Sequence, residues 1–124
     1  MFKTWQASNR VLMKTRRASP SEGQIQKAVF QYLRTRNIPC WRMNVIGIPK
    51  MDGTFRPNSM AGFADILAMF QGTAVALEVK TNKGKQTEKQ KEFQKEFERG
   101  GGSYHIVRNV EQVHEIMKTF EARK

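Results

Sequence analysis

Residues 63–80, FADILAMFQGTAVALEVK, hold the pattern that decides the fold. Two apolar runs of strand length flank a Gln-Gly pair, and this pattern predicts two antiparallel strands joined by a tight turn. Each run carries one carboxylate, Asp65 in the first and Glu78 in the second. If Phe70 pairs with Thr73 across the turn, the register sets Asp65 directly opposite Glu78, with their Cβ atoms about 5 Å apart.

The facing carboxylates predict a cation site. Asp65 and Glu78 repel each other unless a cation or a shared proton lies between them. Hard oxygen ligands favour Mg²⁺ or Mn²⁺ over zinc, and Mg²⁺ is commonly held by one or two carboxylates together with a substrate phosphate. Strand alternation puts Lys80 on the same face as Glu78, where it could orient an attacking water or offset developing charge. The alternative is a solvated strand face with an ordinary Glu–Lys pair.

The charge balance favours a polyanionic partner. The 124 residues include 22 Lys and Arg against 11 Asp and Glu, a net charge of +11, and residues 1–60 contain two acidic residues, Glu22 and Asp52. Such a surface suits DNA, with or without catalysis. The single cysteine, Cys40, excludes an internal disulfide and a Cys-rich zinc site, and no run approaches the roughly 18 apolar residues of a membrane span. We therefore expect no membrane association and a cytoplasmic location.

The chain is long enough for one domain, and we expect a basic N-terminal arm over 1–18 and a single α/β domain over 19–124. Ser19 is the predicted N-cap of the first helix, with Pro20 at its first position. Further elements follow from apolar periodicity and from turn residues. The predicted order is a helix to about Arg36, a strand at 40–47, an exposed loop at 47–62 with a small hairpin at Asp52-Gly53, strands at 63–70 and 73–80, a helix at 87–99, a strand at 103–108 and a helix after Asn109.

Two polar residues each have a structural and a functional interpretation. Glu22 shares the inward, apolar face of the first helix and could be a distal ligand of a metal or its water, but it also completes a capping box with Ser19. Gln90 lies on the same side as the apolar residues of its helix and completes a capping box with Thr87. The residues alone favour the capping role for both.

Several basic or polar residues are candidates for contacts with nucleic-acid phosphates. For the residues on the first strand, a half-exposed strand face is an equally good explanation. The candidates are Arg42 and Asn44 on that strand, Lys50 and Arg56 in the following loop, and Lys83 and Lys85 in the turn after the second acidic strand.

The order of these parts resembles the PD-(D/E)xK nuclease superfamily, and most closely the stand-alone VRR-NUC (virus-type replication-repair nuclease) domain, over about residues 20–115. One departure is Ala64, where the superfamily usually has a proline that shapes the backbone without binding metal. The parts that carry the resemblance are Glu22, Arg42 and Asn44, Gly62-Phe63-Ala64-Asp65, Glu78-Val79-Lys80 and Gln90.

The resemblance implies a restriction-endonuclease-like αβββαβ core, with a mixed central sheet flanked by helices. It implies that the metal is bound by Asp65, Glu78 and the Val79 backbone carbonyl, with Lys80 beside the attacking water. It also implies that Glu22 joins the metal cluster or its water shell. Gln90 would support Lys80 or the scissile phosphate.

The resemblance further implies a Mg²⁺- or Mn²⁺-dependent endonuclease that acts as a homodimer on branched DNA, such as four-way (Holliday) junctions, in DNA repair. A bacterial cell, or one infected by a phage, would be its setting. Flap cleavage or exonucleolytic trimming by the same site is the alternative among enzymes. A basic DNA-binding module without catalysis is the alternative of another class.

Overall fold

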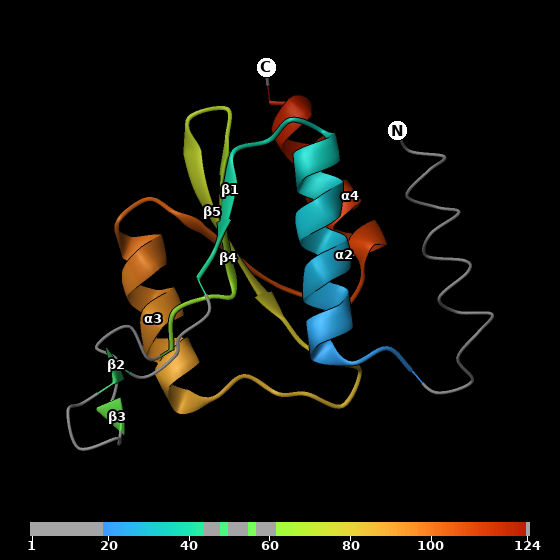
Figure 1. Ribbon diagram of the computed structural model, residues 1–124. Coiled ribbons are helices and arrows are strands. Elements are labelled where there is room, and N and C mark those ends of the chain that lie inside the picture. Colours follow the sequence, from blue (N-terminus) through green and yellow to red (C-terminus); the bar gives the residue numbers. More distant parts are fainter. Residues whose placement is uncertain (1–18, 44–47, 50–54, 57–61, 124) are drawn as a thin grey trace.

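The computed structural model describes residues 19–43, 48–49, 55–56 and 62–123. A four-stranded mixed sheet has the order β1-β4-β5-β6, with α2 and α4 on one face and α3 on the other (Figure 1). The predicted α/β class and the αβββαβ order are confirmed, and one more helix follows. The elements are α2 (Glu22–Thr35), β1 (Cys40–Arg42), β2 (Ile48–Pro49), β3 (Phe55–Arg56), β4 (Ile66–Phe70), β5 (Thr73–Val79), α3 (Glu88–Arg99), β6 (Ser103–Val107) and α4 (Val110–Glu121).

The β4–β5 hairpin has the predicted register, with Phe70 opposite Thr73 and Ile66 opposite Leu77. Its turn residues, Gln71 and Gly72, both have positive φ, 51° and 81°. Two consecutive positive φ values are the mark of a turn whose twist matches that of the flanking strands. The turn therefore fixes which side chains of β4 and β5 share a face.

Strand alternation divides the apolar residues between two clusters. Val75, Leu77 and Val79 of β5 pack with α2 and α4, while Ala76 packs with Tyr104 on the side of α3. Because β5 and β6 are parallel, the chain must cross over between them, and α3 makes this crossover. No helix in the described part of the chain is long and apolar enough to cross a membrane.

The predicted start of the first helix is wrong by two residues. Ser21, not Ser19, is the N-cap: its hydroxyl accepts a hydrogen bond from the Gln24 amide at 3.2 Å, and the Gln24 side chain accepts one from the Ser21 amide at 2.9 Å. Both serines satisfy the sequence rule for a capping box, with Glu22 three residues after Ser19 and Gln24 three residues after Ser21, so the rule alone does not choose between them. Glu22 is consequently the first helical residue and takes no part in the capping box.

Four strands are shorter than predicted, and β5 is one of them, since it ends one residue early at Val79. β1 ends at Arg42, and β4 begins after Asp65 because residues 62–65 leave the ladder. β6 ends one residue early, at Val107. The small hairpin expected in the loop is present as β2 and β3, which pair antiparallel. The predictions for the arm at 1–18, for Asn44 and for Lys50 lie outside the described residues.

Candidate metal centre

Three carboxylates from distant parts of the sequence meet at one end of the sheet. Glu22 begins α2, Asp65 directly precedes β4 and Glu78 lies near the end of β5. One carboxylate oxygen from each lies within 4.8 Å of the other two. The hairpin register brings Asp65 and Glu78 together, as predicted, and α2 adds Glu22 from the opposite side of the sheet. This is a compact set of three carboxylates of the kind that could bind a hard cation.

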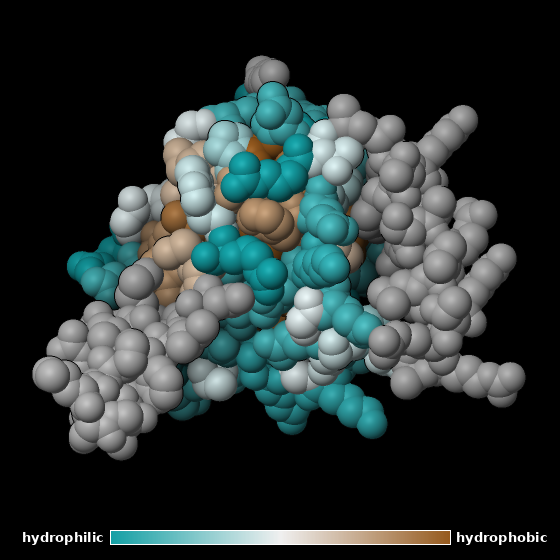
Figure 2. Space-filling view, viewed as in Figure 1, coloured by the Kyte–Doolittle hydropathy of each residue, from teal (hydrophilic) through white to brown (hydrophobic). Residues whose placement is uncertain are grey.

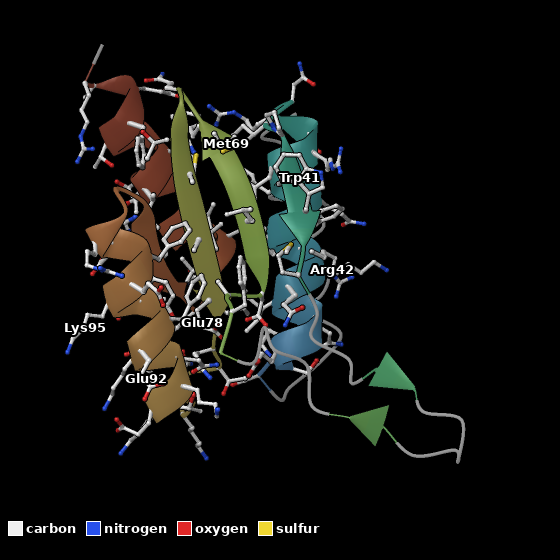
Figure 3. The ribbon with its side chains drawn as sticks, turned by 90° about the vertical axis from the view of Figure 1, so that its left-hand side faces the viewer. Trp41, Arg42, Met69, Glu78, Glu92 and Lys95 are labelled. Atoms are coloured by element: carbon white, nitrogen blue, oxygen red, sulfur yellow. The ribbon has the colours of Figure 1, made fainter. Side chains whose placement is uncertain are left out.

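Glu78 is the most constrained member of the set. Its side chain is buried, with 1% of the residue exposed. It lies between β5 and α3 (Figure 3). Its Oε2 accepts a hydrogen bond from Gln90 Nε2 at 3.0 Å and lies 3.8 Å from Lys80 Nζ. Its Oε1 is buried with no hydrogen-bond partner among the described residues. An orphaned carboxylate oxygen is costly in a folded protein unless a ligand completes its coordination.

The pKa of Glu78 is raised from 4.5 to about 8. Burial is the main cause, followed by the charge and the close approach of the Asp65 side chain, while Lys80 opposes the rise. At neutral pH and without a cation, this carboxyl therefore holds a proton. Since the same oxygen cannot hold a proton and coordinate a metal, a bound divalent cation would replace that proton. The donor set and the orphaned oxygen both fit Mg²⁺ or Mn²⁺.

Backbone contacts on both sides fix Asp65. Its Oδ2 accepts a hydrogen bond from the Val79 amide at 2.8 Å, and its main-chain carbonyl accepts one from the Met43 amide at 2.8 Å. The first contact also places the backbone of Val79 beside the carboxylate cluster. Asp65 is thus held between β1 and β5, although it lies outside the β4 ladder.

Lys80 follows β5 and is buried, with 7% exposed. Its amide donates to the Val107 carbonyl at 3.0 Å, and Gly84 lies over its stem so closely that a Cβ there would be 3.2 Å from Lys80 Cδ. Arg108 holds this loop by donating to the carbonyls of Thr81 and Gly84. Sequence reasoning missed Arg108, because nothing in the pattern of residues connects it with Lys80, which lies far away along the chain.

Gln90 makes the capping contact that the residues alone favoured and also contacts the carboxylate cluster. Its Oε1 accepts the Thr87 amide at 2.8 Å in the capping box of α3, while its Nε2 donates to Glu78. A primary amide has an acceptor end and a donor end, so both contacts exist together. The contact is with Glu78, whereas the resemblance implied contact with Lys80 or the phosphate.

Close packing connects α3 to the segment before Asp65. Gly62 has a φ of +91°, and a Cβ at this position would lie 2.6 Å from the Lys89 carbonyl oxygen. The rings of Phe63 and Phe93 are 4.4 Å apart. The sequence signal for this contact was only a glycine next to the acidic strand, and it does not identify the partner.

The structure describes the side chains of only some of the residues predicted to contact phosphates. Arg42 is exposed at the end of β1 (Figure 3), and Lys83 and Lys85 are exposed in the segment that leads to α3. Arg56 belongs to β3, whose backbone alone is described. Sequence reasoning missed the partner of Arg42. Its guanidinium donates a hydrogen bond to Gln26 Oε1 at 3.2 Å.

Comparison of this chain with protein-family models, curated proteins and solved structures found no match.

Proposed function

We propose that this protein is a Mg²⁺- or Mn²⁺-dependent endonuclease that hydrolyses phosphodiester bonds in branched DNA. The observation that carries the proposal is the group of three carboxylate oxygens within 4.8 Å of one another, one of them from a glutamate with an orphaned buried oxygen. A buried lysine on the same side as that glutamate adds the cation that phosphoryl chemistry needs beside a metal. The net charge of +11 supports a polyanionic substrate.

In this proposal, Asp65 and Glu78 hold the metal, with Glu22 as a third ligand or bound through a water, and the Val79 carbonyl completes the protein ligands. The metal would polarise the scissile phosphoryl group and lower the pKa of a bound water. Lys80 Nζ, 3.8 Å from Glu78 Oε2, would orient the attacking water and offset negative charge on the phosphoryl oxygens.

The preference for four-way junctions, the homodimer and the cytoplasmic location remain part of the proposal. Two symmetric cuts in a junction need two sites related by a two-fold axis, which a homodimer supplies. Trp41 and Met69 are 47% and 37% exposed on the β1–β4 part of the sheet face that α3 leaves open (Figure 3). This apolar pair is a practical position at which to test the dimer: Trp41→Asp should lower the mass measured by light scattering if the pair lies in the interface.

The test of function is a cleavage assay with labelled four-way junction, flap, plain duplex and single strand, in Mg²⁺, in Mn²⁺ and in EDTA. Wild type should nick the junction preferentially and only with metal, and Glu78→Ala should abolish nicking. Glu115→Ala is the matched control, because Glu115 is an exposed glutamate on α4. If all three proteins bind DNA equally and none cleaves it in any metal, the protein is a DNA-binding module without catalysis. Preferred cutting of flaps or strand ends would select the trimming alternative.

A further inference from the structure

Arg42 has an unusual partner for an exposed arginine. It lies on the edge strand β1 opposite Ile66, so its side chain is directed to the α2 side of the sheet. There its guanidinium donates to Oε1 of Gln26, which is 8% exposed. Among the described residues, no carboxylate lies within ion-pair distance of Arg42. A neutral amide therefore orients this guanidinium without cancelling its charge.

The same contact places Arg42 beside the candidate metal centre. Gln26 lies four residues after Glu22 on α2, a rise of about 6 Å, so the two side chains share a face of the helix. The residue after Arg42 donates its amide to the Asp65 carbonyl. Arg42 thus lies between the helix face that carries Glu22 and the main chain of Asp65, on the side of the sheet away from α3. Figure 2 shows that hydrophilic residues cover the exposed side of α2, a surface that suits a charged ligand.

The separation from Glu22 matters for the chemistry. Arginine has five N–H donors in a planar fork, and Gln26 uses one of them. The remaining donors match the oxygens of a phosphate. Without Gln26, the carboxylate of Glu22 would be a competing partner one turn away. An Arg42–Glu22 ion pair would remove a positive charge from the DNA surface and a ligand from the metal.

We propose that Arg42 and Gln26 form a phosphate-binding subsite at the junction of α2 and β1. The subsite takes the DNA phosphate next to the one at the carboxylate cluster, and Gln26 is a positioning residue that keeps Arg42 off Glu22. This inference rests on the proposed function, since it assigns the ligand as DNA. It adds a binding site with a defined location and a residue, Gln26, that acts through another.

The first experiment measures binding without hydrolysis. The full-length protein is titrated onto a fluorescently labelled four-way junction in EDTA, over about 50 to 200 mM salt. Arg42→Gln should weaken binding about tenfold and lower the slope of log K against log salt by about 0.9, the value for one lost phosphate contact. Gln26→Glu should do the same with Arg42 intact, because a carboxylate would neutralise the guanidinium. The control is Arg123→Gln, an exposed arginine just after α4, at the opposite end of the sheet.

The second experiment tests positioning. Gln26→Met keeps the length of the side chain but removes the acceptor, so the freed Arg42 should pair with Glu22 and weaken Mn²⁺ binding, measured by calorimetry without DNA. The double variant Gln26→Met/Arg42→Gln should regain the wild-type affinity for Mn²⁺. A purely structural effect of Gln26 would not be reversed by removing Arg42, so such a reversal separates positioning from packing. Melting curves establish that each variant is folded.

The failures of the two proposals are distinguishable. Suppose that wild type cleaves DNA, but Arg42→Gln and Gln26→Glu show the same slope of log K against log salt as the Arg123→Gln control. The subsite proposal is then wrong, and the nuclease proposal stands. If the slopes change as expected but no metal supports cleavage, the phosphate subsite stands and the hydrolytic function fails. If Gln26→Met leaves Mn²⁺ binding unchanged, Gln26 has no positioning role. Absence of DNA binding by wild type would overturn the subsite altogether.

Discussion

Replacing Glu78 with glutamine should make the metal-free protein more stable at high pH. The pKa of this buried carboxyl is about 8 in the folded protein against 4.5 ordinarily. Below pH 4.5 it is protonated in both the folded and the unfolded state and contributes no difference. Between pH 4.5 and about 8 the unfolded state releases a proton that the folded state keeps, so the free energy of unfolding falls as pH rises. Above about pH 8 the folded protein bears the full cost of the buried charge.

At about 1.4 kcal/mol per pH unit, this cost approaches about 5 kcal/mol as an upper bound. Glu78→Gln has no proton to lose, and its amide oxygen can still accept the hydrogen bond from Gln90. The variant should therefore match wild type near pH 5 and exceed it by several kcal/mol near pH 8.5. Adding Mg²⁺ at about 100 times its Kd should stabilise wild type by about 2.7 kcal/mol and leave the variant unchanged.

The assay is urea unfolding followed by circular dichroism, at both pH values, with EDTA or Mg²⁺. Glu115→Gln, an exposed glutamate on α4, is the control and should follow wild type throughout. The reasoning is refuted if the stability gain of Glu78→Gln changes by less than about 1 kcal/mol between the two pH values, which is the uncertainty of such extrapolations. Equal stabilisation of wild type and Glu78→Gln by Mg²⁺ would refute the assignment of Glu78 as a ligand.

Three further predictions follow from single contacts. Lys80→Met should keep Mn²⁺ affinity within about threefold and lower the cleavage rate at least about 100-fold, because general catalysis by one group contributes about that much; unchanged turnover would remove Lys80 from the mechanism. Gly62→Ala should lower the free energy of unfolding by about 1–3 kcal/mol, since its Cβ would lie 2.6 Å from the Lys89 carbonyl oxygen. A melting curve of the variant identical to that of wild type would contradict this. Gln90→Glu should preserve the start of α3 by circular dichroism, because glutamate also completes a capping box, but it should change Mn²⁺ affinity because the donor to Glu78 is lost; unchanged Mn²⁺ binding would contradict this.

The sequence predicted the parts of the site that depend on local rules. The hairpin register followed from strand length and a two-residue turn, and it correctly set Asp65 against Glu78. The capping box of α3 followed from the spacing of Thr87 and Gln90. These features involve residues close in sequence, so propensity and periodicity are enough to find them.

Other features depend on contacts between distant segments, for which a single sequence carries little signal. Two serines compete as N-cap of the first helix, and the choice between them decides whether Glu22 is part of a cap or free to reach the cluster. The contact of Gln26 with Arg42 requires the exact placement of α2 beside β1. The contact of Gly62 with the first turn of α3 likewise depends on tertiary packing.

The two ends of the Gln90 amide give α3 a direct connection to the carboxylate cluster. One end closes the first turn of the helix, and the other is a hydrogen-bond donor to Glu78. Fraying of that first turn would therefore remove a donor from Glu78 in the same event. Amide hydrogen exchange at the beginning of α3 should accordingly slow when a cation binds to the carboxylates. The exchange rate at this helix end would then report cation binding, although α3 contributes no metal ligand.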